Sequence, residues 1–238
     1  MSEPSNRPDV SRARLMALFF ALGSACFVVA PISAYAHLVG EHADELTFFI
    51  GSVLFTIGGG MQSWLAWAER TSPGAGRAAW WTASIQSAGT LFFNVTTFQA
   101  IHSTVSNPQY DRLVWRPDAF GSVCFLVSGA IAYHASPRHG WLPRRGHRGW
   151  WEASVNLLGC IFFGISAIAG YVVPTTGSIL DLAAANWNTS LGALCFLVCA
   201  VATLKTGRTF KVARLRRLRT LEHAVERDLE QIARWPRT

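Results

Sequence analysis

Residues 51–59 read GSVLFTIGG, and related stretches follow at 121–129 (GSVCFLVSG) and 192–200 (GALCFLVCA). The copies start 70 residues apart (51 to 121) and 71 residues apart (121 to 192), and each lies within a long apolar run. Self-similarity at a fixed period is typical of chains built from repeated structural units. The sequence therefore predicts three related units.

The apolar runs predict an all-α membrane protein. Of the 238 residues, 50% are apolar and 15% are charged, a composition that excludes a disordered chain. About 20 apolar residues in a helix cross the ~30 Å hydrocarbon layer of a bilayer. Six such runs are present, and the predicted spans are residues 15–36, 46–68, 79–101, 119–135, 153–173 and 182–204.

The first apolar run has a second interpretation. The arginines before it and the A-x-A pattern at residues 34–36 are also typical of a cleaved signal peptide. However, the run is longer than a usual signal core, and Gly23 and Phe27 keep the spacing of Gly89 and Phe93 in the third run. We therefore expect a membrane span, with cleavage as the alternative.

The positive charges predict the orientation of the spans. Of the 21 Lys and Arg residues, all but Arg112 and Arg116 fall in four segments: 1–14, 69–78, 136–152 and 205–238. Segments rich in Lys and Arg stay on the cytoplasmic side. Both termini are therefore expected to be cytoplasmic. The net charge of +7 then reflects membrane topology, and no nucleic-acid partner is expected.

The repeat extends to whole helical hairpins. Residues 80–84 (WWTAS) align with residues 150–154 (WWEAS), again 70 positions apart (80 to 150). Spans three and four are therefore copied in spans five and six, and spans one and two form a more diverged copy. Two spans per copy keep every copy in the same orientation, so an axis along the membrane normal should relate them. The predicted fold is six transmembrane helices arranged as three parallel-related hairpins.

The two ends of the chain are expected to lie outside this bundle. Residues 1–14 read as a flexible basic tail. Residues 205–238 combine a dense basic half with Leu218, Val225 and Ile232 at seven-residue spacing. This pattern predicts a basic amphipathic helix on anionic lipid head groups. A partner-binding helix is the alternative, although two heptads are too few to define a coiled coil.

Small and polar residues within the spans are the candidate site residues. Glycines in membrane helices let neighbouring backbones approach closely. The predicted helix-packing residues are Gly51, Ser52, Gly121, Ser122 and Gly192. Polar side chains at depth either form hydrogen bonds between helices, worth about 0.6 kcal/mol each, or line a path for a small solute. The residues of this candidate lining are Gln86, Asn94, Asn156 and Asn188.

No motif indicates catalysis or a cofactor. The sequence lacks a phosphate-binding loop, a dinucleotide fingerprint and a nucleophile elbow. The five cysteines lie in apolar runs without a CxxC pair. His37 and His42 stand near acidic residues but without a metal-binding spacing, so a cation there is the weaker alternative. We expect no enzyme activity, no cofactor and no bound metal.

Three segments resemble the YrhK-like family of bacterial membrane proteins: residues 48–55 (FFIGSVLF), 89–98 (GTLFFNVTTF) and 115–128 (WRPDAFGSVCFLVS). The resemblance covers most of residues 46–204. It implies helical hairpins in a bacterial cytoplasmic membrane, and it carries over no catalytic residue.

The sequence as a whole predicts a non-catalytic membrane scaffold or envelope component that can form a homo-oligomer. The alternative is a facilitator or channel for a small solute along the repeat axis. That alternative requires a continuous polar path past Gln86 and Asn156.

Overall fold

The computed structural model describes residues 7–70, 77–103, 109–136, 138–139, 142–143 and 148–207. This part of the chain contains seven α-helices: α1 (Arg7–Val29), α2 (Ser33–Val39), α3 (Glu41–Glu69), α4 (Arg77–Ile101), α5 (Arg116–His134), α6 (Arg148–Ala169) and α7 (Leu182–Thr206). One π-helical turn, η1 (Asp111–Trp115), precedes α5. Two short antiparallel pairs complete it: β1 (Arg138–His139) with β2 (Leu142–Pro143), and β3 (Val172–Val173) with β4 (Ser178–Ile179). The prediction of an all-α architecture is confirmed.

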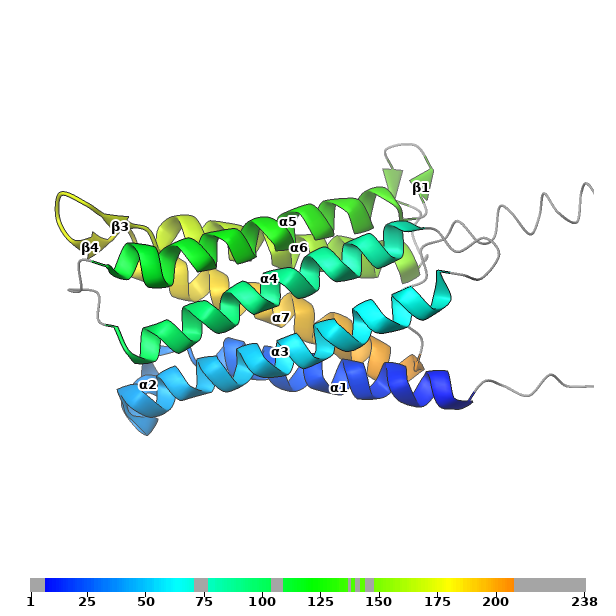
Figure 1. Cartoon of the computed structure of the whole chain (residues 1–238), viewed down its shortest axis with the longest axis horizontal. Helices are drawn as coiled ribbons and strands as arrows, with labels where there is room; N and C mark the ends of the chain where they lie inside the picture. The colour runs from blue at the N-terminus through cyan, green and yellow to red at the C-terminus, as the bar shows by residue number, and fades with distance from the viewer. Residues whose placement is uncertain are drawn as a thin grey trace, which may run out of the picture.

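The six long helices form a closed ring. Each packs against the next in the order α1, α3, α4, α5, α6, α7, and α7 returns to α1. Figure 1 shows these helices running along the long axis of the molecule, with the short α2 at one end. The junction of α7 with α1 includes a hydrogen bond of 3.1 Å from Ser190 Oγ to Val28 O. Segments from opposite ends of the sequence therefore enclose one core.

Four of the described helices are long and apolar enough to cross a membrane. They are α1 (from Val10 onward), α3, α6 and α7. The other two long helices are more polar: Gln86 and Asn94 interrupt α4, whereas α5 has Arg116, Pro117 and Asp118 in its first turn and ends with His134. The composition and length of the four helices are those of a membrane protein.

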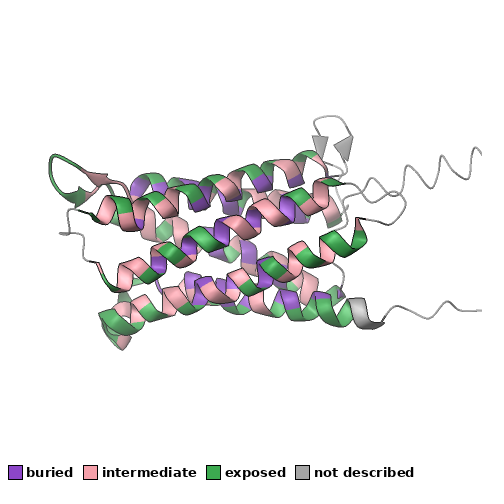
Figure 2. Ribbon diagram, viewed as in Figure 1, coloured by how far each residue is buried: buried purple, intermediate pink, exposed green. Residues whose placement is uncertain are grey.

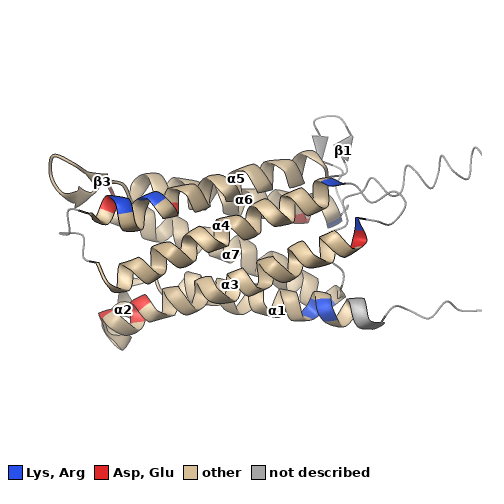
Figure 3. Ribbon diagram, in the orientation of Figure 1, with Lys and Arg blue, Asp and Glu red and all other residues tan. Residues whose placement is uncertain are grey.

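Charged residues lie near the ends of the bundle, and buried residues lie on the sides of the helices that face one another. Figure 3 shows Lys, Arg, Asp and Glu near the two ends of the helices, with uncharged stretches between them. Figure 2 shows buried residues on the helix faces turned toward one another and exposed residues on the outer faces. The outer faces are themselves apolar, with Leu91 55%, Val123 54% and Ile168 68% exposed. Such an apolar girdle suits contact with lipid.

The first helix differs from the predicted span. The apolar run predicts a helix over residues 15–36, whereas α1 occupies Arg7–Val29 and so includes part of the predicted flexible tail. Pro31 stands two residues beyond Val29, and proline disfavours helical geometry in the residue before it, Ala30. The chain bends there and restarts as α2, which ends at Val39 and is followed by Gly40 with a φ of 87°. The apolar composition alone does not reveal this break.

A second difference lies before α5. Residues 102–118 read as a loop, but Asp111–Trp115 form the π-helical turn η1, which runs directly into α5. The Trp115 indole N–H donates to Ala167 O at 2.8 Å, and Thr96 Oγ1 donates to Val114 O at 3.2 Å. These bonds tie the start of α5 to α6 and α4. Charged Asp111 and Arg112 together with Pro117 made this stretch read as a loop. Pro is nevertheless well accepted in the first turn of a helix, which is where Pro117 lies in α5.

The last helix ends within the described residues. The Asp181 carboxylate accepts a hydrogen bond of 2.9 Å from the Ala184 N–H and caps the start of α7. Gly207, with a φ of 60°, follows the end of α7 in the left-handed conformation common at helix ends. The predicted amphipathic helix of residues 205–238 lies outside the described residues beyond Gly207, and the first six residues lie outside them as well.

Candidate functional site

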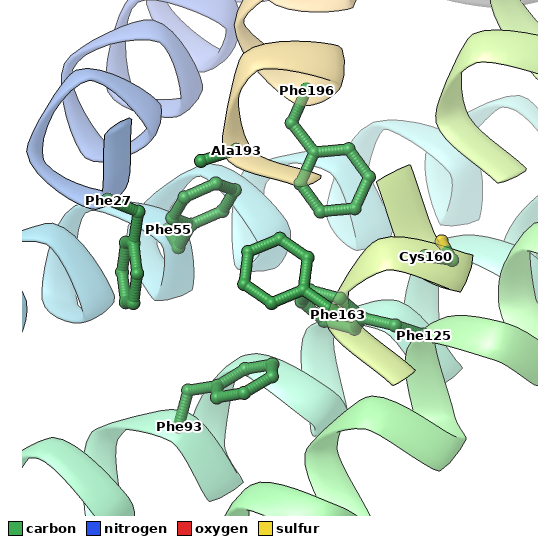
Figure 4. Packing of buried hydrophobic residues seen from close by; sticks show 8 residues of the cluster. All are labelled: Phe27, Phe55, Phe93, Phe125, Cys160, Phe163, Ala193 and Phe196. Atoms are coloured by element: carbon green, nitrogen blue, oxygen red, sulfur yellow. The ribbon is translucent and has the colours of Figure 1, made fainter. Parts of the chain in front are cut away.

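The axis enclosed by the ring is filled by phenylalanine rings. Each of the six long helices contributes one, and each of these side chains is at most 7% exposed. The six are Phe27, Phe55, Phe93, Phe125, Phe163 and Phe196 (Figure 4). Because the rings come from all six helices, they join the whole bundle at one level.

Phe163 is the centre of this phenylalanine cluster. Its ring stacks on Phe196 with centroids 5.5 Å apart and an interplanar angle of 17°. It also contacts Phe93 at 5.7 Å, Phe125 at 5.8 Å and Phe27 at 6.3 Å. Offset and edge contacts of this kind add about 0.5–1.5 kcal/mol per pair to the burial of the rings. The cluster is therefore a packed aromatic core.

A glycine precedes each clustered phenylalanine by four residues. These glycines are Gly23, Gly51, Gly89, Gly121, Gly159 and Gly192. A Cβ built on Gly89 would lie 2.7 Å from Phe125 Cδ1, and a Cβ on Gly121 would lie 3.3 Å from Phe93 Cε2. Each glycine thus makes room for the phenylalanine of the facing helix.

The same reciprocal contact occurs in the other two helix pairs. In α1 and α3, Gly23 faces Phe55 and Gly51 faces the Phe27 ring. In α6 and α7, a Cβ on Gly192 would lie 2.7 Å from Phe163 Cδ2 and 3.0 Å from the backbone oxygen of Gly159. Glycine therefore lets the backbones of each pair approach closely, and the phenylalanines fill the space between pairs. The packing residues named from the sequence, Gly51, Gly121 and Gly192, lie at these crossings.

Gly51 and Gly121 are each followed by a serine. Each of these serines contacts the neighbouring helix on the other side from the helix that its glycine faces. Ser52 Oγ lies 2.9 Å from Thr97 Oγ1 of α4, and Ser122 Oγ donates to Phe163 O of α6 at 3.3 Å. Both serines are almost fully buried, at 0% and 2% exposure. Each glycine–serine pair therefore packs one helix against both of its neighbours in the ring.

The four residues of the candidate lining have separate partners. Gln86 is 7% exposed, and its Oε1 lies 3.2 Å from Ser128 Oγ of α5. Asn94 donates to Thr56 Oγ1 of α3 at 2.8 Å. Asn156 and Asn188 turn to atoms of their own helices, the Cys160 sulfur at 3.8 Å and Ala184 O at 2.8 Å. None of these bonds joins one member of the set to another.

A buried acid at the edge of α6 escaped the sequence reasoning. Glu152 is 8% exposed and accepts a hydrogen bond of 2.6 Å from Arg148 Nε. Arg148 also donates to Ala202 O of α7 at 2.7 Å. This arrangement joins α6 to α7 by charge and by hydrogen bonds. The i, i+4 spacing of the pair was the available sequence signal.

The acidic end of the bundle contains the histidines considered for metal binding. His42 Nδ1 lies 3.8 Å from Glu45 Oε2. Within the described ranges, no three His, Cys, Asp or Glu side chains gather in a way that could hold a metal ion. Burial, and then the nearby Asp118 and Glu45 carboxylates, raise the pKa of the Tyr110 phenol. The carboxylates that act on the Tyr110 phenol therefore come from both α3 and α5.

The ring of helices, its aromatic core and its four membrane-competent helices define an all-α membrane bundle. Comparison with protein-family models, with curated proteins and with solved structures finds no match for this chain. Its function must therefore be inferred from its own residues.

Proposed function

We propose that all six long helices cross the membrane, as three hairpins: α1 with α3, α4 with α5, and α6 with α7. The reciprocal glycine–phenylalanine contacts, made within each of these pairs, support this grouping. α4 has 25 residues, and at 1.5 Å per residue it reaches about 37 Å, enough for a bilayer core. Its exposed Leu91 and Val95 are apolar, as are Val123 and Val127 of α5.

The proposed orientation places both termini in the cytoplasm. The predicted cytoplasmic segments hold most of the positive charge, and tryptophans of α3, α4 and α6 lie beside them. The resemblance to the YrhK-like family remains a prediction, and it favours a bacterial cytoplasmic membrane.

The orientation can be tested with single added cysteines in whole cells. An impermeant maleimide should label Leu180→Cys, which is 56% exposed between α6 and α7, without permeabilisation. Glu69→Cys, at the last residue of α3 and so at the other end of the bundle from Leu180, should react only after the membrane is opened. The unmodified chain, with its five native cysteines, sets the background. The reverse pattern of labelling would contradict the orientation.

Within this bundle, a non-catalytic scaffold or envelope component is the function that we propose. The observation that carries the proposal is the phenylalanine cluster, because it fills the axis that a channel would need. Gln86, 7% exposed and next to Ser128, favours structural hydrogen bonding over a solute path. Exposed apolar faces outside the ring are available for lipid or for a second copy of the chain, so a homo-oligomer is part of the proposal.

Solute flux in reconstituted vesicles separates the scaffold from the facilitator. Vesicles containing the full chain should swell in glycerol or urea at the rate of empty vesicles, since the aromatic core blocks the axis. Faster swelling that Gln86→Leu abolishes would identify a facilitator and overturn the scaffold. Native mass spectrometry of the chain in lipid discs would show in parallel whether copies associate.

A further inference from the structure

At one end of the bundle, two guanidinium groups lie over indole rings. Arg12 of α1 lies over Trp64 of α3, with its Cζ 5.1 Å from the ring centroid. Arg70, which follows α3, lies over Trp67. Trp64 and Trp67 are three residues apart and so share one face of α3. The two stacked pairs are therefore neighbours on one surface.

The aromatic surface continues onto the next helix. Trp67 contacts Trp80 of α4 with ring centroids 5.3 Å apart, and Trp80 contacts Trp81 at 4.6 Å. Trp64, Trp67 and Trp81 remain 50%, 46% and 51% exposed. We call this surface the Arg–Trp corner; it consists of Arg12, Trp64, Trp67, Arg70, Trp80 and Trp81.

The positive charge of the corner is not neutralised by the described part of the chain. Described ion pairs join Arg116 to Asp111 and Arg148 to Glu152, whereas none includes Arg12 or Arg70. Figure 3 shows Lys and Arg at this end of α1, α3 and α4, together with an acidic position at the end of α3. The surface therefore favours an anionic ligand.

The place of the corner in the bundle identifies the anion. α1 and α3 are both long and apolar enough to cross a membrane, so the corner lies at a helix end, where tryptophan rings meet lipid head groups. A guanidinium stacked on an indole can still offer two N–H groups to a phosphate in a two-point hydrogen bond. Arg12 is exposed, whereas the Nε of Arg70 is buried, so the contact from Arg70 falls to its two Nη atoms. We propose that the Arg–Trp corner binds the head-group phosphate of an anionic phospholipid.

This site is separate from the lipid contact predicted for residues 205–238, which fall largely outside the described residues. It is also independent of the proposed scaffold role and of which side of the membrane the corner faces. The proposal needs only a membrane-embedded bundle with this end at the lipid surface.

Native mass spectrometry of the full chain in lipid discs tests the proposal. In discs of phosphatidylcholine with phosphatidylglycerol, the chain should retain phosphatidylglycerol in preference to phosphatidylcholine. Arg12→Gln and Arg70→Gln should each weaken that retention on the order of tenfold, because each removes a charge-assisted contact to phosphate. Arg112→Gln is the matched control: it removes the same charge from an exposed residue of η1, at the opposite end of the bundle.

Three outcomes would overturn the proposal. They are equal losses in Arg112→Gln and the corner variants, equal retention of both lipids, and displacement of the bound lipid by submillimolar glycerol phosphate. The last result would assign the corner to a soluble anion. Helix content from circular dichroism shows whether each variant folds. Arg70→Lys keeps the charge but loses the planar fork, so its retention should be intermediate.

Discussion

Gly192→Ala is expected to destabilise the bundle by about 2–3 kcal/mol, a large effect for one added methyl group. The new Cβ would lie 2.7 Å from Phe163 Cδ2 and 3.0 Å from the backbone oxygen of Gly159. The ring is held by its own stacking on Phe196, and the oxygen belongs to a helix backbone, so neither can move without separating α6 from α7. The free energy of unfolding, from titration with sodium dodecyl sulfate in mixed micelles, measures the loss.

Gly60→Ala provides the matched control for that variant. Gly60 lies in α3, and a Cβ there would meet no heavy atom within 4 Å. Replacing a glycine inside a helix by alanine is normally favourable by roughly 0.5–1 kcal/mol, because the unfolded chain loses freedom. We therefore expect opposite signs for the same chemical change. A similar destabilisation of both variants would show that the helix crossing is not the cause of the effect.

The sequence reveals the helix crossings because their signal is local. Gly192 and Phe196 stand four residues apart, as do Gly51 and Phe55, and such a spacing places both residues on one face of a helix. Apolar runs likewise indicate where the long helices lie. The predicted site residues Gly51, Gly121 and Gly192 therefore fall at real contacts between helices.

The sequence does not reveal which helices become neighbours around the ring. Ser190 and Val28 stand at opposite ends of the chain, and their hydrogen bond depends on α7 returning to α1. The same holds for Arg12 over Trp64, and for the Trp115 N–H that reaches Ala167 O. Contacts between distant residues carry no periodic signal within one helix. For that reason the Arg–Trp corner and the anchoring of η1 emerge only from the structure.

The composition of the spans does not determine whether their polar residues form hydrogen bonds between helices or line a path for a solute. Gln86 and Asn156 stand 70 residues apart, the spacing of the predicted repeat, yet Gln86 accepts a hydrogen bond from Ser128 of the neighbouring helix while Asn156 turns to Cys160 in its own. The difference arises from the partner helix: α5 presents a serine hydroxyl beside Gln86. A shared position in a repeat therefore does not establish a shared contact.

Phe163→Ala is expected to lower the free energy of unfolding by about 3 kcal/mol. In soluble proteins, truncation of a buried phenylalanine costs about 3–5 kcal/mol, through lost transfer free energy and the cavity that remains. The lower end applies here because both folded and unfolded helices stay in lipid, so packing supplies most of the effect. Phe163 contacts four other clustered rings and comes from α6, so its loss loosens every helix pair at once. The same detergent titration measures this change.

Phe120→Ala, on the lipid-facing surface, is the matched control for Phe163→Ala in the aromatic core. Phe120 lies on α5, is 59% exposed, and has one ring contact of 5.9 Å with Phe92. Its truncation removes the same atoms without opening a cavity on the axis, so we expect a loss of less than about 1 kcal/mol. Equal losses in the two variants would mean that ring size alone matters. A much larger loss at Phe163 would show that the six rings act as one packed unit, the property on which a closed, non-conducting bundle depends.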